Sequence, residues 1–241
     1  MSRYQKIANH LRLQIQSGKY RAGDRLPTET ALSKRYSVGL PTLRQAIGVL
    51  QAEGLIDRQH GRGTFVRAPQ PRVTYSNADL VPDRWTVGSI ETDVATYETD
   101  AQGEVARLMA VPEGTPIVEC VYVIRRRGST PHSIVRGYVP RDLATADSPV
   151  TASGPWPWAY DLRSRLATAG IQLDRTVERV TARPPTAGEA ETLGISIGVS
   201  VLVIERTSTD TTGRVVEVAF MTLSGDRTEA VYMMREAQGA P

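Results

Sequence analysis

The segment SVGLPTLRQAIGVLQAEG, residues 37–54, decides the fold of the N-terminal part of the chain. Pro41 lacks a backbone N–H and is tolerated in the first turn of a helix, so a helix can begin there. Gly54 permits the left-handed conformation that ends one. Between them, apolar residues recur at three- and four-residue spacing and predict one buried face: Leu43, Ala46, Ile47 and Leu50. Such a helix could pack inside a protein or bind in a DNA groove. The flanking segments distinguish these two interpretations.

Two further helices are predicted before this segment. Ile7, Leu11 and Ile15 are four residues apart and predict a helix from about Tyr4 to Ser17. Thr28 can cap a short helix that runs to about Tyr36. A tight turn then leads into the helix of residues 41–53. Two short helices joined in this way form a helix-turn-helix, whose second helix enters the major groove of DNA.

A β-hairpin is predicted directly after the third helix, in GLIDRQHGRGTFVRA, residues 54–68. One strand begins at Leu55, its return strand is residues 64–66, and glycines at 61 and 63 permit the turn. Arg62 at the tip can reach the minor groove or the flanking phosphates. His60 lies far in sequence from His10 and His132, with no cysteine or acidic cluster beside it. We therefore expect no metal site and no cofactor.

The charge of the chain is unevenly distributed. Residues 1–72 contain thirteen Lys and Arg against four Asp and Glu, a formal charge of +9, and the remainder carries −6. This asymmetry favours a nucleic-acid-binding N-terminal domain, with a solvated basic surface as the alternative. The single cysteine, Cys120, fits a reducing cytoplasm. No apolar run is long enough to span a membrane, and no secretory signal is expected.

The N-terminal motifs resemble the winged helix-turn-helix of the GntR family of bacterial transcription regulators. GDRLPTE, TLRQAIxxLxxEGLI and GRGTFV stand in register between Tyr4 and Val66. The resemblance implies binding to double-stranded DNA through residues 1–67. Thr42 and Arg44 match DNA-contacting positions of the family. Leu40 departs from the pattern, because the family commonly has a guanine-contacting arginine there, and leucine can touch only a thymine methyl group. The candidate DNA-binding residues are Thr28, Leu40, Pro41, Thr42, Arg44, Gln45, His60, Gly61, Arg62 and Gly63.

Beyond a proline-containing linker predicted at residues 68–82, the chain contains an internal repeat. One constant shift in residue number aligns Ala106 with Ala190, Met109 with Leu193 and Gly114 with Gly198. Each copy predicts a short helix, a glycine turn, an apolar strand, a polar turn and another strand. The two copies suit one pseudo-symmetric α+β domain with an antiparallel sheet, at residues 83–241. Between them we expect a helix at 158–169 and a strand at 174–182. Trp156 and Trp158 either cap the core or line a pocket.

This second domain resembles the UTRA effector-sensing domain of HutC-type GntR regulators. The pattern LxxPxGxPI … YxP … EAxxLGI … LxIER … DxxGxxVE … GDR carries the resemblance. It implies a chorismate-lyase-like fold, a small-molecule pocket and dimerisation through this domain. A homodimer is expected to bind a near-palindromic operator.

Six residues are candidates for the effector pocket. The resemblance implies pocket positions for Arg206 and Glu217, although the two could instead form a surface ion pair. Tyr122, Val135 and Leu223 replace an arginine, a glutamate and a tyrosine that are common in the family. A pocket changed in this way suits an apolar or weakly charged effector better than a sugar phosphate. Arg125 could restore positive charge.

The sequence therefore predicts a transcription repressor whose operator binding is modulated by a cytoplasmic metabolite. An enzyme on the lyase-like domain is the first alternative. We do not expect one, since the domain offers no Ser-His-Asp or Cys-His set. A DNA-binding dimer without an effector is the second alternative.

Overall fold

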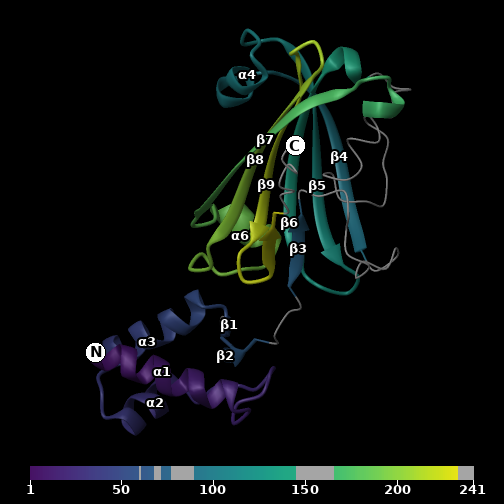
Figure 1. Ribbon diagram of the computed structural model, residues 1–241. Coiled ribbons are helices and arrows are strands. Elements are labelled where there is room, and N and C mark those ends of the chain that lie inside the picture. Colours follow the sequence, from purple (N-terminus) through teal and green to yellow (C-terminus); the bar gives the residue numbers. More distant parts are fainter. Residues whose placement is uncertain (60, 68–71, 77–89, 145–165, 233–241) are drawn as a thin grey trace, which may run out of the picture. The chain divides into compact units, whose positions relative to one another are not determined.

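The structure is a computed structural model of an α+β chain, and it describes residues 1–59, 61–67, 72–76, 90–144 and 166–232 (Figure 1). Its internal contacts divide the chain into two compact units. The first comprises Met1–Arg72, Pro184–Ser200 and Gly225–Arg227, and the second comprises Val73–Arg183, Val201–Ser224 and Thr228–Pro241.

Three helices form the N-terminal core: α1 (Arg3–Gln16), α2 (Glu29–Tyr36) and α3 (Leu40–Ala52). The predicted apolar face of α3 is confirmed, because its buried residues are Leu43, Ala46, Ile47 and Leu50. They pack with Leu11 and Leu32 from α1 and α2. Each fully buried leucine contributes about 1.5–3 kcal/mol relative to an exposed one, so this small core holds the three helices together.

The helix ends follow the predicted signals. Thr28 caps α2, because its Oγ1 accepts a hydrogen bond of 3.2 Å from the backbone N–H of Ala31. After α3, Gly54 has a φ of +70°, and the next N–H, of Leu55, donates to the carbonyl of Leu50 over 3.0 Å. The wing follows as the predicted hairpin of β1 (Ile56–Gln59) and β2 (Gly63–Val66), with Gln59 opposite Gly63.

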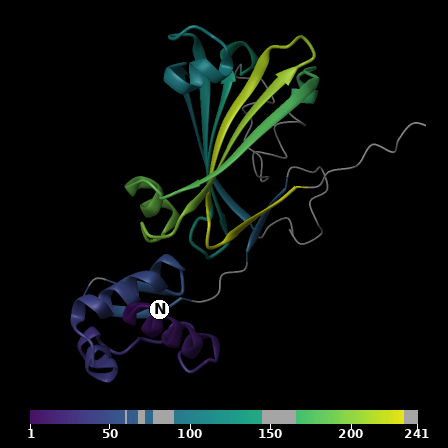
Figure 2. The ribbon, with the colours of Figure 1, turned by 60° about the vertical axis from the view of Figure 1, so that its left-hand side comes forward.

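The second unit is built on a six-stranded antiparallel sheet with strand order β4-β5-β6-β9-β8-β7 (Figure 1). The strands are β4 (Ile90–Asp100), β5 (Pro116–Arg126), β6 (Ser133–Pro140), β7 (Leu173–Arg183), β8 (Val201–Asp210) and β9 (Val215–Ser224). Figure 2 shows the strong twist of this sheet.

The internal repeat is a structural repeat. The shift found in the sequence relates helix α4 (Gly103–Met109) to helix α6 (Ala187–Leu193), and β4, β5 and β6 correspond in the same way to β7, β8 and β9. The two copies meet where β6 pairs with β9. Arg136 pairs there with Phe220, and the same shift relates these two residues to each other. The sheet is therefore two similar three-stranded halves joined at their inner strands.

The sheet has two different faces, which register and the two-residue side-chain period define. We call one the core face: it carries a buried cluster that includes Cys120, Tyr122, Val135, Ile204 and Met221. We call the other the α4 face, because α4 packs there, with Ala106 and Met109 beside Ile117 and Val218.

Two segments depart from the sequence predictions. Residues 73–76, predicted to lie in a linker, form strand β3 (Val73–Ser76), which pairs in parallel with β10 (Thr228–Val231). The helix predicted at 158–169 lies mainly outside the described residues, as do Trp156 and Trp158, and only 166–168 are described as helical. The strand predicted at 174–182 is confirmed as β7.

Candidate nucleic-acid interface and effector site

The polar side of α3 is the candidate reading surface for DNA. Leu40 is the first residue of the helix and is 38% exposed. Pro41, Arg44 and Gln45 are exposed as well, and Thr42 is half-buried. A helix that buries one face in its own domain while presenting this polar side has the arrangement that major-groove binding needs.

The wing presents its tip to solvent. Gly61 and Arg62 are exposed, whereas His60 lies outside the described residues. Gly63 has a φ of +120°, and a Cβ there would lie 2.6 Å from Nε of Arg25. Glycine is therefore favoured at residue 63 by its backbone conformation, and a larger side chain would also displace the guanidinium of Arg25. Thr28, which is also a predicted DNA contact, uses its hydroxyl oxygen to cap α2.

Sequence reasoning missed two residues beside α3. Glu29, at the start of α2, accepts a hydrogen bond of 2.8 Å from Nε of Arg44 through Oε2. Its Oε1 lies 3.1 Å from Nη2 of Arg58 on β1. One carboxylate thus contacts an arginine of the helix and an arginine of the wing. Glu29 belongs to the GDRLPTE motif, but nothing in the motif indicates its partners.

Five of the six predicted effector residues share the core face. Tyr122 pairs with Val135 across β5 and β6, and Leu223 lies two positions from Met221, the partner of Val135 on β9. Arg206 and Glu217 lie on the same face of β8 and β9. All five are buried.

Arg125, the sixth predicted effector residue, lies apart from the other five. It lies three residues from Tyr122 on one strand, so the two-residue period places it on the α4 face. There it forms ion pairs with Glu91 and Asp93 of β4. Its charge is therefore not available to a site on the core face.

Arg206 and Glu217 form the centre of a buried polar cluster. Nη2 of Arg206 donates to Oε1 of Glu217 over 2.7 Å, and Oγ of Ser208 donates to Oε2 over 2.7 Å. Only 7% of the Arg206 side chain and 1% of the Glu217 side chain are exposed. Burial alone would lower the pKa of Arg206, but the charge of Glu217 raises it above its ordinary value. The pair is therefore not the surface ion pair considered as an alternative.

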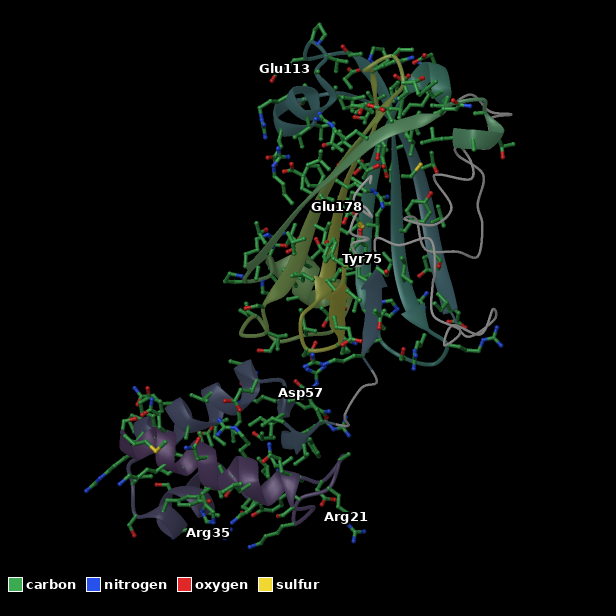
Figure 3. The ribbon with its side chains drawn as sticks, in the orientation of Figure 1. Arg21, Arg35, Asp57, Tyr75, Glu113 and Glu178 are labelled. Atoms are coloured by element: carbon green, nitrogen blue, oxygen red, sulfur yellow. The ribbon has the colours of Figure 1, made fainter. Side chains whose placement is uncertain are left out.

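Glu178 and Tyr75 extend this cluster and were not predicted (Figure 3). Oε1 of Glu178, on β7, lies 3.9 Å from Nη1 of Arg206 and accepts a hydrogen bond from the hydroxyl of Tyr75. Burial raises the pKa of the Tyr75 hydroxyl far above its ordinary value, and the bond to Glu178 adds to this effect. Within the described residues, Nε of Arg206 and Oε2 of Glu178 have no hydrogen-bond partner.

Two other features lie outside this cluster. A hollow of about 220 Å³ is lined by Met109, Ile117 and Pro140 and by the ion pair of Asp142 with Arg214, and no predicted effector residue lines it. His132 is buried, with Nδ1 2.7 Å from Oγ of Ser133. Among the described residues, His, Cys, Asp and Glu form no group of three that could hold a metal ion.

No described helix is both long enough and apolar enough to cross a membrane.

A winged helix-turn-helix with an exposed polar helix, followed by a domain with a buried polar cluster, defines a DNA-binding regulator with a sensor domain. Comparisons with known proteins give the family. Residues 3–66 match the gntR family of bacterial regulatory proteins, and residues 89–229 match the UTRA domain. The chain therefore belongs to the GntR family of transcription regulators and carries a UTRA domain.

The chain is similar to named repressors and to a solved structure, over all or part of its length. The HTH-type transcriptional repressor NagR of Bacillus subtilis is 29% identical over 236 residues, which cover 96% of this chain and 94% of NagR. The mannosyl-D-glycerate transport/metabolism system repressor MngR of Escherichia coli is 31% identical over 109 residues, which cover 45% of this chain and 42% of MngR. A crystal structure described as a GntR-family regulator matches 98% of this chain and 99% of its own, with 27% identity and a TM-score of 0.65.

Proposed function

We propose that the chain is a cytoplasmic repressor that binds a near-palindromic operator as a homodimer and changes its operator affinity when a small molecule binds on the core face. The relatives NagR and MngR, both named as repressors, support the direction of regulation. The exposed polar side of α3 supports DNA reading through Thr42, Arg44 and Gln45. No enzymatic activity is needed for this function.

The main support for an effector site on the core face is the asymmetry between the two halves of the sheet. The shift that relates the halves pairs Arg206 with Tyr122, Glu178 with Val94 and Ser208 with Ile124. Tyr122 and Ile124 belong to the buried apolar cluster of the core face, and Val94 packs against it. The fold therefore forms this face from apolar residues in one half. Because apolar residues can often replace a buried ion pair without loss of stability, the presence of these charges in the other half favours a role in binding.

The charges of the cluster favour an effector rich in hydrogen-bond donors. The described residues contribute one arginine and two carboxylates, so Arg206 is already balanced and a negative charge remains. A phosphate would add to that negative charge, whereas an ammonium or hydroxyl group could donate to the carboxylate of Glu178, which also lies beside the hydroxyl of Tyr232. We propose an effector with a cationic or hydroxyl-rich group at this point.

The test uses the full chain, an operator recovered by selection from genomic DNA, and the protein-free metabolite fraction of bacterial cytoplasm as the probe. Glu178→Gln removes one carboxylate, and Arg125→Gln removes a charge from the α4 face as the matched control. We expect all three proteins to bind the operator equally without the probe. The probe should release wild type and Arg125→Gln but not Glu178→Gln. Equal release of all three would overturn the site.

A further inference from the structure

The carboxylate of Glu29 joins three elements of the DNA-binding unit. It begins α2, contacts Arg44 on α3 at 2.8 Å and contacts Arg58 on β1 at 3.1 Å. Only 21% of the Glu29 side chain is exposed, compared with 60% for Arg44 and 58% for Arg58. The acid is thus held beneath two solvent-facing arginines. The carboxylate of Glu29 therefore forms a contact that connects the recognition helix to the wing.

This contact is better suited to orientation than to stability. Exposed ion pairs contribute little to the stability of a fold, so the fold does not depend on this contact. An arginine side chain, however, loses much of its rotamer freedom when it is fixed. A partner that fixes Arg44 before DNA arrives reduces that loss on binding. The bond to Glu29 uses Nε of Arg44, which leaves both Nη groups for the bidentate contact that reads guanine.

The same geometry gives Arg58 a role. Its guanidinium approaches the carboxylate that holds Arg44, and its side chain stays largely exposed on the first wing strand. One carboxylate between two arginines leaves a net positive charge at the junction of helix and wing. A DNA phosphate beside the groove matches that charge.

We propose that Glu29 is a positioning residue that orients Arg44 for base reading, and that Arg58 is a further phosphate-contacting residue. This assignment rests on the proposed DNA contact of Arg44. Glu29 also limits binding to the wrong DNA, because its negative charge opposes phosphate contacts while the orientation it imposes favours one base contact. Specificity therefore depends on Glu29 more than affinity does.

The experiment measures the affinity of the full chain for a selected operator and for random DNA over a range of salt concentrations. Glu29→Gln should reduce the ratio of the two affinities by about fivefold or more, which is the lower end of the discrimination given by one bidentate base contact. Its affinity for random DNA should stay equal or rise. Glu53→Gln is the matched control, because it removes the ion pair with Arg12 in the same unit and should leave the ratio unchanged.

Two more variants complete the test. Glu29→Asp keeps a negative charge at the start of α2 but shortens the reach to both arginines, so it should reduce the ratio as Glu29→Gln does. This variant also covers a folding defect caused by loss of the helix-end charge. Arg58→Ala should weaken operator and random DNA alike and reduce the salt slope by about one. A ratio within twofold of wild type in both Glu29 variants overturns the positioning role. An unchanged slope in Arg58→Ala overturns the phosphate contact. If wild type itself does not distinguish operator from random DNA, the DNA-reading function fails instead.

Discussion

Arg206 on β8 and Glu217 on β9 form a 2.7 Å ion pair inside the sheet domain, and Ser208 holds the second oxygen of the carboxylate. Because both charges are buried, each depends on the other to offset the loss of water. The pair is a diagonal contact between neighbouring strands, since the direct register partner of Arg206 is Ala219. Its position fixes the chemistry at the centre of the proposed effector site.

Removal of one member of this pair should destabilise the fold strongly. Arg206→Met leaves the Glu217 charge buried without its main partner, and the free energy of unfolding should fall by about 3–5 kcal/mol. The double variant Arg206→Met/Glu217→Leu should recover part of this loss, because the Glu217 charge is removed as well, while Glu178 and Ser208 still lose a partner. Urea unfolding followed by circular dichroism measures both changes. A double variant no more stable than Arg206→Met would contradict this account of the pair.

Tyr138 should make stability depend on alkaline pH. Burial, together with the hydrogen bond that its hydroxyl donates to Glu119, raises the pKa of Tyr138 to about 12. A raised pKa means that the folded state favours the protonated phenol. Its stabilising contribution is therefore complete below pH of about 10 and is lost as the pH rises towards about 12.

The measurement compares urea unfolding at pH 9 and pH 11.5. Wild type should lose more stability between these two pH values than Tyr138→Phe does. Tyr97→Phe is the control, because Tyr97 is 53% exposed on the same α4 face and should not change the difference. Equal losses in wild type and Tyr138→Phe would show that the Tyr138 hydroxyl does not titrate in this way.

The wing tip should contribute to affinity more than to specificity. Arg62→Ala should weaken binding to all DNA sequences about evenly and reduce the salt slope by about one, as expected for one lost phosphate contact. Arg107→Ala, an exposed arginine on α4, is the control and should leave the slope unchanged. A changed base preference with an unchanged slope would mean that Arg62 reads the minor groove instead.

Leu40 should determine one base of the operator. Leu40→Arg introduces the arginine that is common at this position in the family. The variant should favour sites with guanine at the matching half-site position. Leu13→Arg adds the same charge to an exposed position of α1 and controls for general attraction to DNA. Selection from random DNA compares the motifs. If the Leu40→Arg motif equals that of wild type, residue 40 does not face a base.

Local sequence signals were sufficient for most of the fold. The spacing of Leu43, Ala46, Ile47 and Leu50 predicted the buried face of α3, and the internal repeat predicted the two halves of the sheet. Strand β3 could not be predicted in this way. It is short, and its partner, β10, follows only after the whole six-stranded sheet. Such a pairing leaves no local period to detect.

The candidate sites were harder to predict than the fold. Motif positions identified Arg206 and Glu217, but Glu178 and Tyr75 reach them from β7 and β3, which no motif connects. The exclusion of Arg125 was available from the sequence, because residues three apart on a strand face opposite sides. Tyr122 therefore could not share a site face with Arg125. The shared contact of Glu29 required the three-dimensional approach of α2, α3 and β1.

We propose that this chain recognises a specific DNA sequence, and that a small molecule bound to its UTRA domain changes its affinity for that sequence. The most direct measurement is the affinity of the full chain for its selected operator relative to random DNA, at one salt concentration, with and without the cytoplasmic metabolite fraction. We expect a ratio of about 10³ or more without metabolites and a marked fall when they are added. A ratio below about ten without metabolites would contradict sequence-specific recognition, and a high ratio that metabolites leave unchanged would contradict the effector response.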